Sequence, residues 1–230
     1  MTGDVADFWL IETDVPDEVV ASLERLLDED ERRRAGDFGR AAERRRFVAA
    51  HGAARIIIGR RLGAPPAQLA WRHGPHGKPE LAGPWTGAQM SLSHSGALAA
   101  LAITSTRRIG VDIERLRAGV DVSRMSTRFY PPAEARYVLA ATGPAEQATR
   151  FIRLWTRKEA CVKVTGGRLI PGLLLPAAGP GQVLVSDPGG PLPGPYLVRD
   201  VPVPDDGFCA AVALEGAHPY QVTSHRWPGA

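Results

Sequence analysis

The chain contains 230 residues, of which 44% are hydrophobic and 23% are charged, and its formal net charge is +3. This composition is typical of a folded globular protein and not of a disordered chain, and no run of about 18 apolar residues predicts a transmembrane helix. Two cysteines, Cys161 and Cys209, exclude a disulfide framework and a cysteine-rich zinc site, and the first residues lack a signal-peptide pattern. We therefore expect a cytoplasmic protein that does not associate with membranes.

The first third of the chain predicts one strand followed by helices. DFWLIET (residues 7–13) is typical of an edge strand. PDEVVASLERLLDEDERRR (16–34) predicts a single helix that Pro16 opens, with acidic residues in its first turn. Residues 43–62 predict a second helix, because apolar side chains recur at helical spacing and Gly63 stands at its end.

Strands and helices then alternate to the end of the chain. MSLSHSGALAALAITS (90–105) predicts two strands joined by a Ser-Gly turn, and RIGVDIERL (108–116) predicts another strand. Helices are expected at about 132–141 and 145–164, followed by four short strands: QVLVSD, YLVRDV, FCAAVAL and YQVTSH. PGLLLPAAGPGQ and DPGGPLPGP between them are predicted loops. This order indicates an α+β fold of two similar units, 1–108 and 109–230, with a seam near 104–120.

Arginine is concentrated early in the chain. Between Arg32 and Arg61 there are ten arginines against two acidic residues, Asp37 and Glu43. Such a segment favours a polyanionic partner, either a nucleic acid, a membrane surface or a phosphorylated small molecule. A solvated helix face in an arginine-rich chain would have the same pattern. Nucleic-acid binding is the less favoured interpretation, since only two aromatic residues are interleaved with these arginines.

Carboxylates in two segments are candidates for a metal site. Asp112 and Glu114 in GVDIE lie two residues apart on a predicted strand, so their side chains emerge on the same face. Glu159 and Lys163 in WTRKEACVK are four residues apart and share a helix face. Glu159 would supply the third oxygen ligand that Mg²⁺ needs. The alternatives are an exposed strand face for the first pair and a surface ion pair for the second.

Other polar residues are candidates for phosphate contacts. Ser93, His94 and Ser95 stand at a strand-to-turn junction, and Lys78 lies in the turn-like HGPHGKPEL. Only three of the 28 basic residues are lysines, Lys78, Lys158 and Lys163, which suggests that these positions require a compact ammonium group. A structural histidine and an ordinary turn are the alternatives. No G-x-S-x-G, Walker A or G-x-G-x-x-G sequence supports a hydrolase, a P-loop or a Rossmann fold.

The chain contains, in this order, the basic helix, GKP, SHS, GVDIE, F-x-x-x-x-E and WTRKEACVK. In this order the chain resembles a 4′-phosphopantetheinyl transferase of the Sfp type over residues of about 30–170. The resemblance implies two similar α+β subdomains that form a pseudo-dimer within a monomeric protein. It implies transfer of 4′-phosphopantetheine from coenzyme A to a serine of an apo acyl or peptidyl carrier protein, with release of 3′,5′-ADP. Fatty-acid, polyketide and nonribosomal-peptide carriers all remain open.

The resemblance also assigns roles to the candidate residues. Asp112, Glu114 and Glu159 would bind Mg²⁺, with Mn²⁺ a substitute, and Glu159 and Lys163 would be the catalytic residues. The groups implied to contact coenzyme A are Lys163, His94, Ser93 and Asp112 at the pyrophosphate, Lys78 at the nucleotide end, and Arg34 and Arg46 near the 3′-phosphate. Glu134 would position water or a ligand, and Lys158 would form a structural salt bridge away from the site.

The chain departs from the family pattern at three places. Ser91 stands where the family often has asparagine, Glu31 where it has a lysine, and the glycines of TGGRL are adjacent. None of these affects the proposed metal ligands. The rival hypothesis is a catalytically silent protein that binds coenzyme A or another polyanion, and the complete carboxylate trio argues against it.

Overall fold

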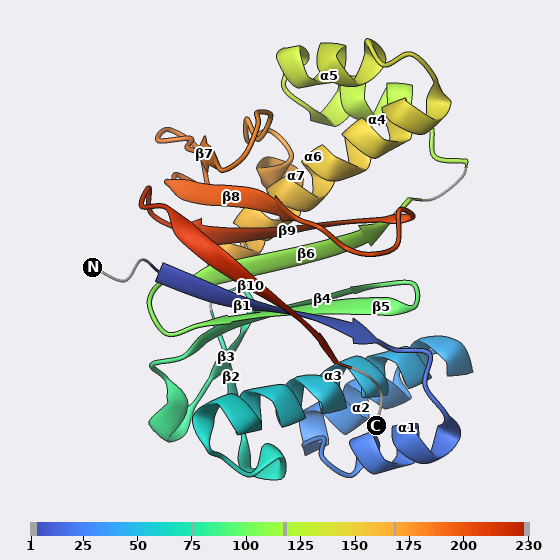
Figure 1. Ribbon diagram of the computed structural model, residues 1–230, viewed down its shortest axis with the longest axis vertical. Helices are drawn as coiled ribbons and strands as arrows, with labels where there is room; N and C mark the ends of the chain where they lie inside the picture. Colours follow the sequence, from blue (N-terminus) through green and yellow to red (C-terminus); the bar gives the residue numbers. More distant parts are fainter. Residues whose placement is uncertain (1–3, 75, 117–118, 168, 228–230) are drawn as a thin grey trace.

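The computed structural model describes residues 4–74, 76–116, 119–167 and 169–227 as an α+β fold with two four-stranded sheets (Figure 1). Pro75 of HGPHGKPEL, residues 117–118 of the expected seam and Arg168 of TGGRL lie outside the described residues. The first sheet has the order β10-β1-β5-β4, formed by Tyr220–Trp227, Asp4–Glu12, Leu98–Thr104 and Gln89–Ser95. The second has the order β6-β9-β8-β7, formed by Ile109–Arg115, Phe208–Glu215, Tyr196–Val201 and Val183–Val185.

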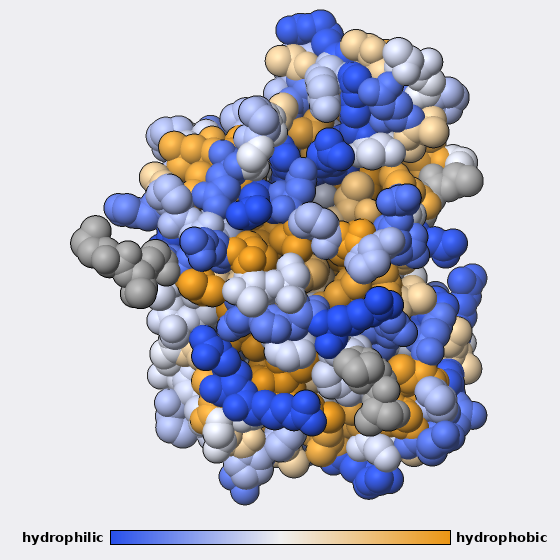
Figure 2. Space-filling model, viewed as in Figure 1, coloured by the Kyte–Doolittle hydropathy of each residue, from blue (hydrophilic) through white to orange (hydrophobic). Residues whose placement is uncertain are grey.

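The sheets form the middle of a layered structure. Apolar side chains of β1 and β5, such as Phe8 and Ala100, pack in one cluster with Val111 and Ile113 of β6. The other face of the first sheet is covered by α3 (Ala41–Leu62), and that of the second by α6 (Pro144–Thr165). Figure 1 shows these helices on opposite sides of the strands. Figure 2, in the same view, shows hydrophobic residues at the surface along the middle of the molecule.

The sequence predicted that the first strand is an edge strand, but in the structure it is an internal strand of the first sheet. β1 lies between β5, with which it is antiparallel, and β10, with which it pairs in parallel from Asp4 opposite Tyr220 onwards. The error has a simple cause, because the strand that covers this edge lies at the other end of the chain. The first sheet therefore takes strands from both ends of the sequence, and the contiguous division at residue 108 stays a prediction.

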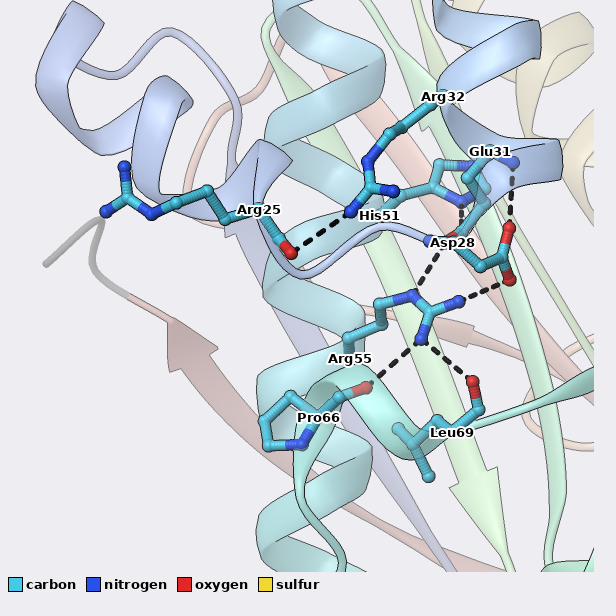
Figure 3. Close-up of polar contacts among 8 residues, drawn as sticks. All are labelled: Arg25, Asp28, Glu31, Arg32, His51, Arg55, Pro66 and Leu69. Atoms are coloured by element: carbon cyan, nitrogen blue, oxygen red, sulfur yellow. Dashed lines mark hydrogen bonds and ion pairs between the residues drawn. The ribbon is translucent and has the colours of Figure 1, made fainter.

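The single helix expected at 16–34 is two helices, α1 (Asp17–Glu24) and α2 (Glu29–Gly36). Asp28 caps the start of the second helix, because its carboxylate accepts a hydrogen bond from the backbone N–H of Glu31 (2.9 Å). In return, the carboxylate of Glu31 accepts a hydrogen bond from the backbone N–H of Asp28 (3.2 Å). The buried guanidinium of Arg55 in α3 contacts both carboxylates and donates to the carbonyls of Pro66 and Leu69 (Figure 3). This cluster fixes α2 against α3.

Most other expected elements are present. α3, α6, α5 (Pro132–Leu139) and the four C-terminal strands agree with the sequence pattern, and Gly63 ends α3 at a φ of 64°. The elements not expected are the ribbon of β2 (Trp71–His73) and β3 (Pro79–Leu81), the 3₁₀ turns Pro66–Gln68 and Gly83–Trp85, α4 (Val122–Phe129) and α7 (Leu169–Gly172). No helix within the described ranges is long and apolar enough to cross a membrane. The pseudo-dimer relation between the two halves stays a prediction.

Gly110 sets the distance between β6 and α6. A Cβ atom at this position would stand 2.0 Å from the carbonyl oxygen of Ala160 and 2.7 Å from the nitrogen of Val164, both in the α6 backbone. Since a helix backbone cannot yield as a side chain can, the strand and the helix would have to separate.

We predict that Gly110→Ala lowers the free energy of unfolding by about 1–3 kcal/mol or more, the usual cost of overpacking, as measured by urea denaturation. Gly87→Ala is the matched control, because a Cβ there meets no atom within 4 Å. Equal stability of the two variants would show that the close contact of β6 with α6 does not constrain the fold.

Candidate active site

The two sheets meet where β4 runs beside β6, each the edge strand of its own sheet. From Ser91 onwards serine occupies every second position of β4, so the hydroxyls of Ser91, Ser93 and Ser95 lie on one face. The hydroxyl of Ser91 accepts a hydrogen bond from the N–H of Val111 (3.1 Å), and that of Ser95 accepts from the N–H of Arg115 (3.1 Å). Side-chain hydroxyls therefore satisfy part of the edge of β6 that has no backbone partner strand.

The same serines hold the carboxylates of β6. Ser93 donates to Oδ1 of Asp112 (2.8 Å), and Ser95 donates to Oε2 of Glu114 (2.7 Å). The ammonium of Lys163, from α6, donates to Oδ1 of Asp112 (2.6 Å) and to the hydroxyl of Ser93 (2.8 Å). Three elements, β4, β6 and α6, thus meet at one hydrogen-bonded unit of Ser93, Asp112 and Lys163.

Glu159 completes a group of carboxylates around this unit. Burial, followed by the negative charge of Asp112, raises the pKa of Glu159 to about 7; Glu114 adds to this effect and Lys163 opposes it. Glu159 and Lys163 both line the same cavity as the two β6 carboxylates. Asp112, Glu114 and Glu159 therefore lie near one another beside the ammonium of Lys163, and their negative charge adds to burial in disfavouring ionisation of Glu159.

The three carboxylates are not arranged as a ready-made metal site. Within the described ranges, no three His, Cys, Asp or Glu side chains form a group that would hold a metal ion. One feature nevertheless fits a cation: the second oxygen of Asp112, Oδ2, is buried and has no hydrogen-bond partner among the described residues. Buried carboxylate oxygens normally have a partner, and hard cations such as Mg²⁺ take carboxylate oxygens as ligands.

The cavity is large enough for a nucleotide-sized ligand. Its volume is about 700 Å³. One end is lined by Ser93, His94 and the charged residues described above, and the other by residues of α2, α3 and β2, among them Arg34, Phe47, His51 and Trp71. The guanidinium of Arg34 lies over the ring of Phe47, 5.2 Å from its centre. Most predicted site residues therefore line one cavity: Arg34, Ser93, His94, Asp112, Glu114, Glu159 and Lys163.

Arg46 and Lys78 lie elsewhere. Arg46 makes a two-pronged ion pair with Asp14 (2.8 and 3.1 Å) and lines a neighbouring cavity of about 580 Å³, which His94 also lines. The ammonium of Lys78 donates to the carbonyls of Ile109 (2.7 Å) and Val164 (2.9 Å), and burial lowers its pKa to about 8. Lys78 therefore joins the first residue of β6 to the last turn of α6, and a nucleotide contact by either residue stays a prediction.

Lys158 forms the structural salt bridge that was expected. Its buried ammonium lies 2.5 Å from Oε2 of Glu134 and also contacts the carbonyl of Leu175. The other oxygen of Glu134 accepts from the N–H groups of Ala177 (2.6 Å) and Ala178 (2.7 Å). Glu134 therefore fastens the chain after α7 to α5, and it does not line the main cavity as a water-positioning residue would.

Sequence patterns did not single out two parts of this site. The serine alternation of β4 was visible in SLSHS, but the contact of these hydroxyls with β6 was not. His51 lies one helical turn after Phe47 and stacks on it, with ring centres 4.0 Å apart. The i, i+4 spacing was a usable signal for a shared face, although it gave no indication that this face lines a cavity.

The chain is similar to proteins of one enzyme family. A family model described as the 4′-phosphopantetheinyl transferase superfamily matches residues 108–176, the segment that carries Asp112, Glu159 and Lys163. The 4′-phosphopantetheinyl transferase HetI of Nostoc sp. is 35% identical over 219 residues, which cover 94% of this chain and 90% of HetI. A putative 4′-phosphopantetheinyl transferase of Synechocystis sp. is 32% identical over 72% of this chain and 66% of its own length. The 4′-phosphopantetheinyl transferase of Bacillus subtilis is 32% identical over 57% of this chain and 59% of its own length.

The raised pKa of Glu159 predicts a pH-dependent loss of stability in the absence of divalent cations. Its folded-state pKa of about 7 lies above the ordinary value of 4.5, so ionisation destabilises the fold progressively as the pH rises from about 4.5 to about 7. Glu159→Gln does not ionise and avoids this loss. The melting temperature of the variant relative to wild type should therefore increase between pH 5 and pH 8. Glu18→Gln, on the exposed side of α1, is the control, and a difference that is constant with pH would contradict the assigned environment.

Proposed function

The chain belongs to the 4′-phosphopantetheinyl transferase superfamily, and we propose that the cavity at the junction of β4, β6 and α6 is its active site. The enzyme transfers the 4′-phosphopantetheine group of coenzyme A to a carrier protein. The observation that supports this location most strongly is the unit of Ser93, Asp112 and Lys163 beside Glu159. It offers hydrogen-bond donors, a positive charge and a weakly acidic carboxylate around one point.

The chemistry requires these groups. The hydroxyl oxygen of the carrier serine forms a bond to the phosphorus that carries pantetheine, and the bond from that phosphorus to 3′,5′-ADP breaks. Negative charge develops on the phosphate oxygens, where Lys163, Ser93 and His94 would stabilise it. The proton of the serine passes to the carboxylate of Glu159, which lines the same cavity.

Mg²⁺ fits the carboxylates of this cavity. Asp112, with its unpartnered oxygen, Glu114 and Glu159 would hold it, and their excess negative charge supports a bound cation. When bound, the ion would supply positive charge to the pyrophosphate of coenzyme A. Mn²⁺ is a plausible substitute. Of the arginines, Arg34 lines the cavity and is the better placed for the 3′-phosphate, because Arg46 would first have to leave Asp14.

The carrier is proposed to be an apo acyl or peptidyl carrier protein, and the enzyme to act as a monomer. A silent protein that only binds coenzyme A is the less favoured function, since Asp112, Glu159 and Lys163 line the cavity together. The two functions differ in one observable, because only the transferase attaches a phosphopantetheine group covalently to the carrier.

We predict that incubation with coenzyme A, Mg²⁺ and an apo carrier adds the mass of one phosphopantetheine to the carrier, as measured by mass spectrometry. A panel of fatty-acid, polyketide and nonribosomal-peptide carriers would show which class is served. Excess chelator should abolish the gain and Mg²⁺ should restore it. Binding of coenzyme A without a mass gain on any carrier would favour the silent protein, and full activity in excess chelator would exclude the metal.

The same assay tests the base. Glu159→Gln retains the shape of the side chain and removes the proton acceptor, so its turnover should fall by about 10²–10⁴-fold. Glu146→Gln is the control on the same helix, because Glu146 pairs with Arg150 at the surface. A loss of less than about tenfold for Glu159→Gln would assign the base role to another group.

A further inference from the structure

The two ends of the main cavity differ in their lining residues. Phosphate groups are favoured at the end with Lys163, Ser93 and His94. At the other end the carboxylates of Asp28 and Glu31 are ion-paired with Arg55, and that of Asp30 is ion-paired with Arg33. This end also has aromatic walls, Phe38, Phe47 and Trp71. A flat aromatic base therefore fits this end, because bases stack on aromatic side chains.

His51 is held rigidly at this end. Its ring stacks on Phe47, and its Nδ1 lies 2.9 Å from Oε1 of Glu31. Glu31 is itself fixed, since its other oxygen accepts from Nε of Arg55 (2.6 Å) and from the N–H of Asp28 (3.2 Å). Figure 3 shows Glu31 between His51 and Arg55, at the start of α2. His51 is thus a cavity-lining side chain with one ring nitrogen already committed.

The hydrogen bond to Glu31 determines what the other nitrogen presents. The pKa of Glu31 is lowered by His51 and Arg55 against the opposing effect of burial, so Glu31 is an ionised acceptor and the proton lies on Nδ1 of His51. Burial lowers the pKa of His51, which keeps the ring neutral. Nε2 is then a hydrogen-bond acceptor, and no described residue donates to it. A ligand at this end needs a donor to match it.

We propose that the pair of Glu31 and His51 selects a 6-aminopurine base, with the amino group of adenine donating to Nε2 of His51. The inference rests on the proposed function, since it assigns an orientation to coenzyme A in its cavity: the pyrophosphate at Lys163 and adenine between α2 and α3. It gives Glu31 a role at the position where the family pattern has a lysine. A 6-oxopurine would place a carbonyl oxygen, a second acceptor, against Nε2.

Two ligands that differ at this one position provide the test. Adenosine 3′,5′-bisphosphate carries the amino group and inosine 3′,5′-bisphosphate carries an oxygen, and their dissociation constants are measured by calorimetry without any carrier protein. Wild type should prefer the adenosine ligand by about tenfold or more, as expected when a buried acceptor loses its donor. His51→Phe keeps a stacked ring and removes the acceptor, so the preference should fall to near unity.

A second variant tests the direction of the hydrogen bond. In Glu31→Gln the amide oxygen would keep the bonds to Arg55 and Asp28, and the amide nitrogen would donate to Nδ1 of His51. The proton would then lie on Nε2, and the preference should reverse towards the inosine ligand. His73→Phe, a histidine of β2 that lines the same cavity, is the control and should keep the wild-type preference.

The outcomes separate this inference from the function on which it rests. Loss of the preference in His51→Phe and its reversal in Glu31→Gln would support the inference. Wild-type binding of the adenosine ligand with no preference over the inosine ligand, or an unchanged preference in His51→Phe, would overturn it and leave the transferase function intact. Failure of wild type to bind either ligand would overturn both the inference and the placement of coenzyme A.

Discussion

The site depends on the way in which two sheet edges are joined. β4 and β6 belong to different sheets, and serine side chains bridge them in place of a backbone ladder. The bridge fixes the carboxylate of Asp112, which is only 2% exposed, and presents it to α6. Gly110 lets α6 approach β6 closely enough for Lys163 to reach the same carboxylate. The arrangement of charges therefore follows from the packing of the two halves, and no loop is needed to position it.

Burial of these charges gives them their chemistry. Burial, followed by the negative charge of Asp112, raises the pKa of Glu159 to about 7, and this environment favours a cation. The preceding residues of α6 are turned away and paired elsewhere: Arg157 with Asp200, and Lys158 with Glu134. These two ion pairs fix the rotation of the helix. Lys163, in contrast, faces the cavity, and its compact ammonium donates to two acceptors, Asp112 and Ser93.

Sequence patterns predicted the helices, strands and motifs that depend on residues close in the chain. They did not predict features that depend on contacts between distant segments. The periodicity of α3 and α6 and the short strands gave the α+β class, and motif spacing identified Asp112, Glu159 and Lys163, which line one cavity. The position of β1 could not be predicted, because its parallel partner β10 lies about 200 residues away. The helix break at Asp28 depends on a capping box that was legible in the sequence, and on Arg55, which was not. The contacts of Lys78 with the carbonyl groups of Ile109 and Val164 could not be predicted, because only the fold brings these elements near it.

The central claim is that Ser93 and Lys163 act with Asp112 as one unit on the phosphates of coenzyme A. A double-mutant cycle tests it most directly, with the dissociation constant of coenzyme A measured by calorimetry for wild type, Ser93→Ala, Lys163→Met and the double variant. If the unit is real, the two losses should not add, and the coupling should lie in the range of about 0.5–3 kcal/mol found for side chains in one hydrogen-bond network. Losses that add to within about 0.3 kcal/mol, as for independent sites, would contradict the account.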